Sequence, residues 1–511
     1  MSPSYLLLLP IILPIAGAIF AIAGFPARRM AVTAAALNLL VSVAILASYQ
    51  FDKGGFQMLM SFPVVPSLGI SFTLGVDGLS LAMLLLSTVV TLAAVCVARS
   101  PQTNAHWFYA SLLFISAGAI GAFVSVDAFF FYMFHELALL PTFLLIGIWG
   151  SGDRQAAAWK ITIYLAFGSF VLLIGLIGLY LAQPVGARSF DMRAIAEHAQ
   201  LGTLFAHDTV HSFSIFGFEY LSITWSQIVY LLLFLGFGVL VSLFPFHTWA
   251  PQAYASAPAP AAMLHAGVLK KFGLYGILRL VTPVFPPHIA GPLNTFLLVL
   301  LLGNILYVGL VTISQRKLDL MLGYSSVMHM GYIFLGILAW NQIGLTGAAL
   351  MLVAHGLSVA ALFALNGELR ERTGTLEFSE LGGLAKSMPI FGLLFGFATM
   401  ASIGLPGFAN FAGELMVFFG AFSAGTHKGG GFNNFQITTV IAVWGVVISA
   451  VYMLRAYRRI FMGPLADRWK SLADIATLPR FCVTGLIVLL LVAGFFPQIL
   501  IKLIASAIIR L

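Results

Sequence analysis

Four charged side chains stand inside long apolar segments, where a charge is costly. Glu136 lies in FFFYMFHELALLPTFLLIGIWG, Lys270 and Lys271 lie in LHAGVLKKFGLYG, and Glu414 lies in IGLPGFANFAGE. A charge at the centre of a membrane costs about 2.5–3.5 kcal/mol on insertion scales. Acids and amines kept at such positions are typical of groups that take up and release protons, and the alternative is a structural role in helix packing. We favour proton transfer for Glu136, Lys271 and Glu414.

Histidines accompany these charges. His247, His265, His329 and His355 all lie in or beside apolar segments. Imidazole titrates nearest neutral pH, so a series of histidines is suited to proton relay, whereas a single one is more often a packing residue. The sequence favours a relay role for His247, His329 and His355 and leaves His265 open.

Adjacent residues on a helix point about 100° apart. Lys270 and Lys271 are therefore not expected to face the same partner, and the residues alone do not decide which one faces the interior. Lys160, near the start of another apolar segment, is either an anchor at the membrane edge or a charge partner for Glu136.

The sequence gives little support for a metal site or a redox centre in this chain. The chain has only two cysteines, Cys96 and Cys482, and no C-x-x-C, H-E-x-x-H or Gly-rich nucleotide motif. The pair His135–Glu136 is a weak metal signal, because neighbouring residues diverge on a helix. We expect no cofactor and no metal in this chain.

Composition indicates a membrane protein. The 511 residues are 60% hydrophobic and only 8% charged, against about 25% charged in soluble domains. The net charge of +8 comes from Lys and Arg in short loops, which argues against nucleic acid binding. Apolar runs long enough to span a bilayer predict an all-α polytopic protein with about fourteen transmembrane helices. These lie near 4–24, 30–49, 76–98, 108–126, 128–150, 159–183, 224–247, 258–281, 294–315, 320–340, 343–366, 388–424, 436–457 and 480–505.

Loop charges predict the orientation. With fourteen spans, most Lys and Arg residues, such as Arg99, Arg316 and Arg370, fall on one side, which should be cytoplasmic. Both termini should then face outward from the inner (cell) membrane of a bacterium.

Two spans should be broken. The seventh ends in LFPFHTWAP and the twelfth contains IGLPGFANFAGE, where prolines and glycines interrupt the helix. Breaks five spans apart suggest two inverted five-helix repeats, which often enclose a transport site. The expected organisation is N-terminal helices 1–3 in residues 1–107, a first repeat (helices 4–8) in 108–281, an inverted second repeat (helices 9–13) in 282–457, and a cytoplasmic loop with helix 14 in 458–511.

Several blocks together resemble a known family. FHELALLPTFLLIGIWG, PFHTWAPQAYASAPAPAAMLHAGVLKKFGLYGILR, LGYSSVMHMGYIFLGI, AHGLSVAALFALNGELRER and ASIGLPGFANFAGELMVFFGAF are similar to the antiporter-like membrane subunits of respiratory complex I. The likeness is to the chain M (subunit 4) type, covers about residues 75–460, and extends to Mrp-type antiporter subunits.

The resemblance implies a function and a set of residues. It implies a proton-translocating subunit driven by quinone reduction elsewhere, with NAD, flavin, iron–sulfur clusters and quinone in partner subunits. Its partners would be other membrane subunits, including neighbouring antiporter-like ones, and the lipid bilayer. Its relay residues would correspond to Glu136, Lys271, His329, His355 and Glu414.

One departure concerns the first half of the relay. The family usually has a lysine seven residues before His247, where this chain has Leu240, and often a histidine where this chain has Tyr254. His247 or Lys270 is a candidate for the missing cation. Two alternatives stay open: an Mrp-type cation/proton antiporter subunit without redox coupling, and a structural subunit whose polar residues only hold helices together.

Overall fold

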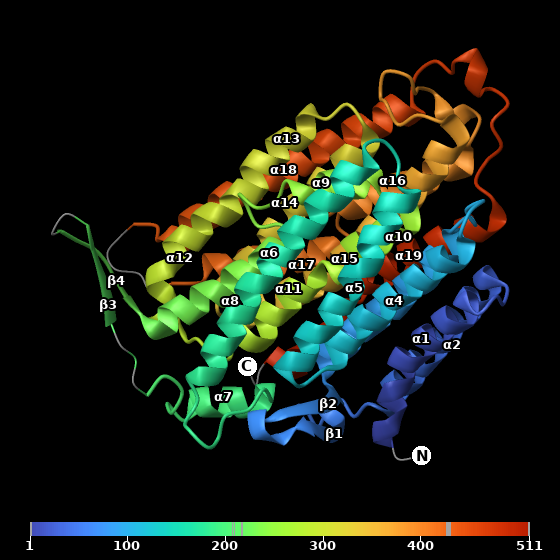
Figure 1. Cartoon of the computed structure of the whole chain (residues 1–511). Helices are drawn as coiled ribbons and strands as arrows, with labels where there is room; N and C mark the ends of the chain where they lie inside the picture. Colours follow the sequence, from blue (N-terminus) through green and yellow to red (C-terminus); the bar gives the residue numbers. More distant parts are fainter. Residues whose placement is uncertain (1–2, 207, 209, 216–217, 426–430, 509–511) are drawn as a thin grey trace.

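The computed structural model describes residues 3–206, 208, 210–215, 218–425 and 431–508 as a bundle of long helices (Figure 1). A 3-10 turn (Pro3–Leu8) precedes the first helices, and a short antiparallel hairpin separates α2 from α3. The elements of this N-terminal part are α1 (Leu9–Ile22), α2 (Ala27–Ser48), β1 (Gln57–Val65), β2 (Ile70–Val76) and α3 (Gly78–Val97).

The middle of the chain contains both broken and unbroken helices. Its elements are α4 (Ala105–Val124), α5 (Ala128–Trp149), α6 (Arg154–Leu181), α7 (Met192–Gln200), β3 (Val210–Ile215), β4 (Phe218–Thr224), α8 (Trp225–Val241), α9 (Trp249–Ser256), α10 (Ala259–Leu264) and α11 (Lys271–Gly276). Two π-helical turns, His265–Leu269 and Ile277–Val281, continue α10 and α11 as one rod. The two hairpins and α7 lie between the predicted spans, so the all-α prediction holds for the bundle itself.

The last part of the chain repeats long helices and one break. Its helices are α12 (Pro287–Leu302), α13 (Gly309–Ser314), α14 (Leu318–Leu338), α15 (Gln342–Thr373), α16 (Pro389–Ile403), α17 (Ala409–Phe422), α18 (Asn434–Phe461), α19 (Thr477–Phe495) and α20 (Gln498–Ile508). A third π turn, Gly303–Val308, joins α12 to α13. The predicted last span, 480–505, is two helices, because Pro497 lacks an N–H and disfavours a helical Phe496.

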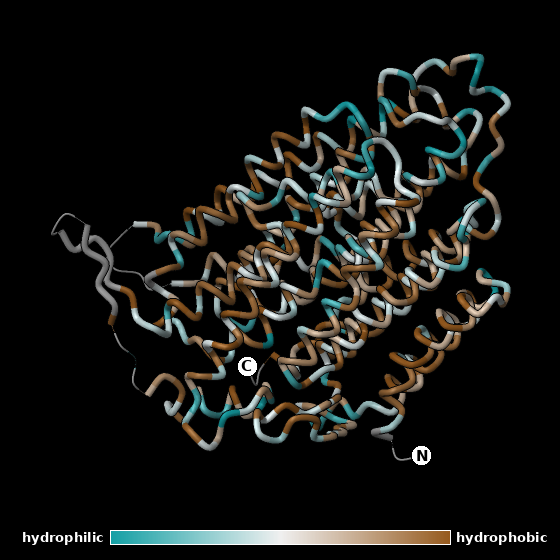
Figure 2. The backbone as a smooth tube through the Cα atoms, in the orientation of Figure 1, coloured by the Kyte–Doolittle hydropathy of each residue, from teal (hydrophilic) through white to brown (hydrophobic). Residues whose placement is uncertain are grey.

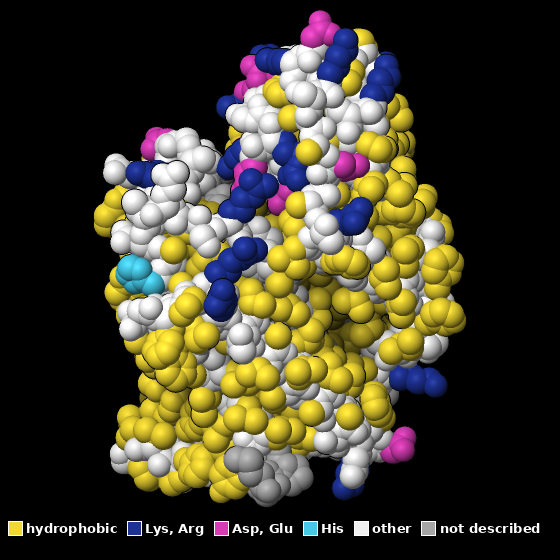
Figure 3. All heavy atoms as spheres, turned by 90° about the vertical axis from the view of Figure 1, so that its right-hand side faces the viewer, with side chains coloured by type: hydrophobic (Ala, Val, Ile, Leu, Met, Phe, Trp, Pro, Cys, Tyr) yellow, Lys and Arg dark blue, Asp and Glu magenta, His cyan; other side chains and the backbone are white. Residues whose placement is uncertain are grey.

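The chain is an integral membrane protein. Within its described residues, eleven helices are long and apolar enough to cross a membrane, and shorter apolar helices include α8, α16 and α17. The apolar residues run along the helices, and the polar ones gather at the ends (Figure 2). Charged side chains cluster at one end of the bundle above a broad hydrophobic surface (Figure 3). The ends of the chain lie at the opposite end, beside β1 and β2 (Figure 1). The count of fourteen spans, the inverted repeats and the four domain ranges stay predictions.

The inner helices differ from the outer ones in burial. The apolar stretch of α15 is wholly buried inside the protein, and those of α3, α4 and α14 are largely buried. In the corresponding stretches of α2 and α19, only about a third of the residues or fewer are buried. The helices that carry His329 and His355 are therefore central in the bundle.

Both predicted breaks are present; a side chain binds backbone groups at the first, and backbone hydrogen bonds close the second. After α8, the Asn304 amide accepts from Phe244 N (2.7 Å) and donates to Ser242 O (3.0 Å). Between α16 and α17, Gly404 (φ +79°) and Gly407 (φ +104°) adopt backbone angles that favour glycine. Irregular backbone at membrane depth is tolerated only where protein or water satisfies it.

Candidate functional site

The centre of the site joins Lys271 to His355. Lys271 is fully buried, and its Nζ donates to Ala266 O at 2.9 Å and lies 2.8 Å from His355 Nδ1. Ala266 belongs to the π turn that precedes α11, and His355 lies in the middle of α15. The two side chains are thus positioned for direct proton exchange between an amine and an imidazole.

His329 of α14 continues this contact. Its ring centroid is 5.5 Å from that of His355, and its Nδ1 lies 2.8 Å from Ser325 O and its Nε2 3.0 Å from Ser402 O. A neutral imidazole has a single N–H, so it can donate to only one of these carbonyl oxygens. When the ring is protonated it has two N–H groups, and the other carbonyl oxygen can then accept the second one.

Glu414 lies at the far side of the same break. Ser402 is in the last turn of α16, and Gly404 two residues later contacts the carboxylate of Glu414, which is 4% exposed. The end of α16 and the glycine after it therefore lie between His329 and Glu414. His329 contacts the carbonyl oxygen of Ser402, and Glu414 packs on Gly404.

Lys270 lies on another side of the rod from Lys271. Its Nζ is 3.4 Å from Ser326 O and 5.7 Å from the centre of the Tyr254 ring. The Tyr254 hydroxyl lies 3.2 Å from His265 Nδ1. Lys270, Tyr254 and His265 form a second buried group beside the Lys271–His355 pair. The contacts of the Lys270 ammonium described above are with a serine and a tyrosine rather than with an acid.

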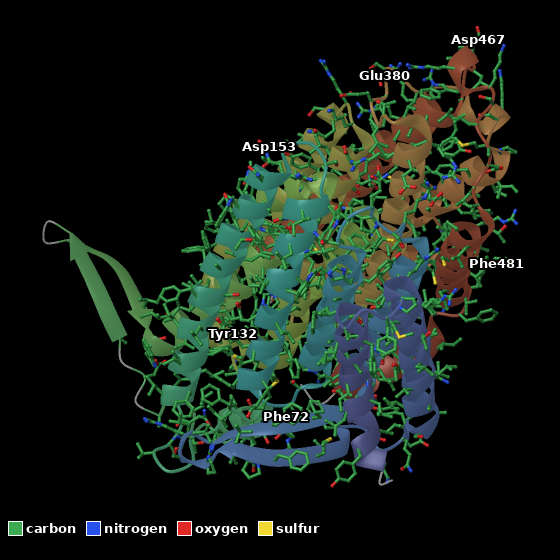
Figure 4. The ribbon with its side chains drawn as sticks, turned by 45° about the vertical axis from the view of Figure 1, so that its right-hand side comes forward. Phe72, Tyr132, Asp153, Glu380, Asp467 and Phe481 are labelled. Atoms are coloured by element: carbon green, nitrogen blue, oxygen red, sulfur yellow. The ribbon has the colours of Figure 1, made fainter. Side chains whose placement is uncertain are left out.

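Glu136 is less buried than the sequence suggested. Its side chain is 30% exposed, and its Oε1 lies 3.6 Å from Nδ1 of the buried His135. The His135 ring stacks on Phe272, with centroids 4.1 Å apart, and Phe272 directly follows Lys271. Tyr132, one turn before Glu136, lies along the bundle between Phe72 and Asp153 (Figure 4). Glu136 thus faces the outside of this chain while His135 faces its interior.

The segment after α8 carries His247, and α8 itself carries Leu240. His247 is 5% exposed, stacks on Phe244 and has no hydrogen-bond partner for Nδ1 among the described residues. Leu240 is buried at the close contact of α8 with Gly168 of α6. The side chain at this position is therefore part of a tight helix–helix seam.

Comparisons with known proteins identify the family. A family model described as "NADH:quinone oxidoreductase/Mrp antiporter, TM" matches residues 125–442. The chain belongs to this family. The match covers both broken helices, all seven predicted relay residues and the π turn before Lys270.

Individual relatives of the family cover nearly the whole chain. NADH-quinone oxidoreductase subunit M of Rhodobacter capsulatus is 33% identical over 95% of this chain and 90% of its own length. NAD(P)H-quinone oxidoreductase chain 4 2 of Thermosynechococcus vestitus is 35% identical over 88% of this chain and 80% of its own length.

Solved structures agree with the fold. A chain of respiratory complex I from Thermus thermophilus superposes with a TM-score of 0.84 at 26% identity, covering 98% of both chains. A chain of the Mrp complex from Dietzia sp. superposes with a TM-score of 0.81 at 20% identity, covering 100% of this chain and 98% of its own, and it supports the fold alone.

In this member of the NADH:quinone oxidoreductase/Mrp antiporter family, the seven predicted relay residues fall into four places. Lys271, His355, His329 and Glu414 follow one another through side-chain and backbone contacts. Lys270 stands beside them, and Glu136 is separated from them by the rings of His135 and Phe272. His247 stacks on Phe244 rather than contacting that row. Lys160 binds Gln252 (2.9 Å), which favours the anchoring interpretation.

Sequence reasoning missed two members of the buried polar set. It treated His135 only as a weak metal signal and Tyr254 only as a departure from the family. The signal for His135 was available, since it precedes Glu136 by one residue and so must face a different side of α5. Within the described residues, no group of three or more His, Cys, Asp or Glu is arranged to hold a metal ion.

Proposed function

We propose that this chain is a proton-translocating membrane subunit of a complex I-type NADH:quinone oxidoreductase. The observation that carries the proposal is the row of neighbouring buried side chains from Lys271 through His355 and His329 to Glu414, which packs against Gly404. Electron carriers (NAD, flavin, iron–sulfur clusters and quinone) belong to partner subunits, in line with the names of the relatives.

The mechanism transfers one proton along this row. A change of charge in a neighbouring membrane subunit acts on Glu136, at the surface of this chain. Lys271 then gives a proton to His355 Nδ1 along their 2.8 Å contact, and His329 receives it in turn. The proton then passes to Glu414, which releases it to the other side of the membrane. Moving one charge against 100 mV requires about 2.3 kcal/mol, which a modest change in local charge can supply.

The distribution of charges supports a proposed orientation in the membrane. The Arg- and Lys-rich end of the bundle is cytoplasmic in this proposal, and both chain ends face outward from a bacterial inner membrane. Protons enter from the end that carries Arg99 and Arg370 and leave at the end of β1 and β2.

The test is proton pumping by Glu136→Gln in native membrane vesicles, at equal amounts of assembled complex. We expect NADH-driven pumping to fall at least fivefold while assembly is unchanged. A matched control is Glu380→Gln, which alters an acid at the charged end of the bundle, far from Tyr132, which lies one turn before Glu136 (Figure 4). Normal pumping by Glu136→Gln would favour a structural role for this acid.

An Mrp-type antiporter subunit is the second candidate, because the description of the matching family model names the Mrp antiporter beside NADH:quinone oxidoreductase. Purification of the native complex distinguishes the complex I-type candidate from the Mrp-type candidate. Flavin and iron–sulfur subunits that co-purify with this chain support the first proposal, and cation-driven proton movement in a complex without them supports the second.

A further inference from the structure

A cavity of about 270 Å³ opens beside the charged end of the bundle and extends toward the buried polar group. Its lining includes Arg99, Glu368 and Glu371 at the outer part and Tyr254, Ala262 and Phe363 deeper inside. The relay described above does not use this cavity.

The inner wall of the cavity carries polar groups that lead to the lysines. The hydroxyl of Tyr254 lies 3.2 Å from His265 Nδ1, and the Tyr254 ring lies beneath the ammonium of Lys270. The backbone N–H of Lys270 donates to His265 O (2.9 Å) across the π turn, so residues 265 and 270 follow one another on one side of the rod. The side chain of Tyr254 therefore lines the cavity on one side and contacts Lys270 and His265 on the other.

The side wall holds an unsatisfied polar atom. Asn366 also lines the cavity, is 5% exposed, and its Oδ1 has no hydrogen-bond partner among the described residues. Buried polar atoms are generally hydrogen-bonded, to ordered water where protein offers no partner. The volume has room for several water molecules, and Asn366 gives one of them an acceptor.

Ion pairs cross the outer part of the cavity. Arg99, just beyond the end of α3, pairs with Glu371 and lies 3.7 Å from Glu368, both on α15. Glu368 is itself buried and also pairs with Arg372. The Arg99 side chain is 56% exposed, so its pairs are of the weak, solvent-screened kind that can open readily.

We propose that this cavity is the proton entrance of the chain and that Arg99, by pairing with Glu371 and Glu368, is the latch that closes it. The proposal rests on the proposed function for its direction of transfer. With Arg99 swung away, water reaches Tyr254. A proton from the cytoplasm arrives along this water as hydronium and passes to the Tyr254 oxygen, which leaves neutral water behind. The hydroxyl proton of Tyr254 passes at the same time to His265 Nδ1, so the positive charge moves to the imidazole and none is left on the tyrosine.

The first test measures access to the cavity rather than pumping. The intact complex, with Cys96→Ser and Cys482→Ser, carries Ala262→Cys in the cavity wall. Inside-out vesicles are treated with a membrane-impermeant cationic methanethiosulfonate. We expect Cys modification from the cytoplasmic face, at least tenfold faster when Arg99→Ala is added. Absence of modification, or an equal rate with and without Arg99→Ala, would overturn the latch.

A matched control removes another ion pair from the same end of the bundle. Lys317 pairs with Glu377 at 3.2 Å, and neither lines this cavity. Lys317→Ala should leave the modification rate at position 262 unchanged, and an equal acceleration by both substitutions would overturn the assignment to Arg99. Ala259→Cys, nearer the opening, replaces Ala262→Cys if the latter prevents assembly.

The second test concerns the route beyond the cavity. Tyr254→Phe removes the hydroxyl but keeps the ring under Lys270. We expect proton translocation to fall at least fivefold with an unchanged modification rate at Ala262→Cys. Unchanged translocation would overturn the route through Tyr254. If the proposed function itself is wrong, the access measurements still decide the cavity and its latch, because they do not depend on pumping.

Discussion

The carboxylate of Glu414 packs directly against Gly404, so that a Cβ at this position would displace the carboxylate. The glycine also has φ +79°, in the left-handed region. Both facts make this residue a determinant of where the last acid of the row stands. The break in span twelve is thus shaped to hold a carboxylate.

Gly404→Ala should impair both stability and pumping. The left-handed backbone costs alanine about 1–2 kcal/mol, and the added methyl group displaces Glu414. Gly463→Ala is the control, because Gly463 also has a positive φ (+94°) but no neighbouring atom within 4 Å of where an alanine methyl would stand. Thermal unfolding of the purified complex should show a loss for both, and vesicle pumping a loss only for Gly404→Ala. Equal pumping by the two variants would contradict the role of the contact.

The two lysines should differ in their effects on pumping. Lys271→Met breaks the contact with His355 and should reduce proton translocation more than tenfold. Lys270→Met leaves that contact intact and removes an ammonium near Ser326 and Tyr254, so we expect a smaller, two- to fivefold reduction. Each variant controls for the other, since both replace a buried lysine on the same rod. A larger loss for Lys270→Met would reverse their assigned order.

Restoring a lysine at position 240 should destabilise this chain. The side chains of Val239 and Leu240 fill the seam against Gly168, at 2.9 and 3.1 Å from a Cβ placed there. A buried charge without a partner typically costs about 3–5 kcal/mol. Leu240→Lys should therefore lower the amount of assembled complex, measured by native gel electrophoresis, while Leu240→Met should not. Normal assembly with increased pumping would show that the seam accommodates the cation.

A buried ion pair at the end of the bundle that carries β2 is expected to be important for stability. Arg279 pairs with Asp77, the residue that caps α3, and both side chains are 4% exposed. Asp77→Asn would leave the guanidinium uncompensated, at a cost of about 3–5 kcal/mol. Asp191→Asn breaks the more exposed pair with Arg193 and should cost less than about 1 kcal/mol. Thermal unfolding of the two variants distinguishes these cases, and equal losses would contradict the burial argument.

Much of the bundle follows from patterns that act locally. Apolar length predicts the spans, and Pro245, Gly404 and Pro406 predict the breaks, because the missing N–H and the free backbone act where these residues stand. The hairpin β1–β2 escaped prediction, since its strands alternate only weakly and sit between spans.

The pairing of the site residues depends on contacts that a single sequence does not contain. Lys270 and Lys271 look equivalent in the sequence, and only the packing of α15 against the rod brings His355 to Lys271. Glu136 is likewise more exposed than its apolar surroundings in the sequence suggest. The face of α5 turned to α11 instead carries Phe131 and His135, which both stack on Phe272. Three-dimensional packing, rather than residue type, selects the connected row.

The π turn at His265–Leu269 determines which lysine meets His355. A π turn bonds each N–H to the carbonyl five residues back, and thus holds one residue more than an α-helical turn. Were this stretch α-helical, every residue beyond it would be rotated by about 100°, the angle that separates Lys270 from Lys271. The shifted hydrogen bond of this turn therefore decides whether Lys271 or Lys270 faces His355, while the helix keeps its place in the bundle.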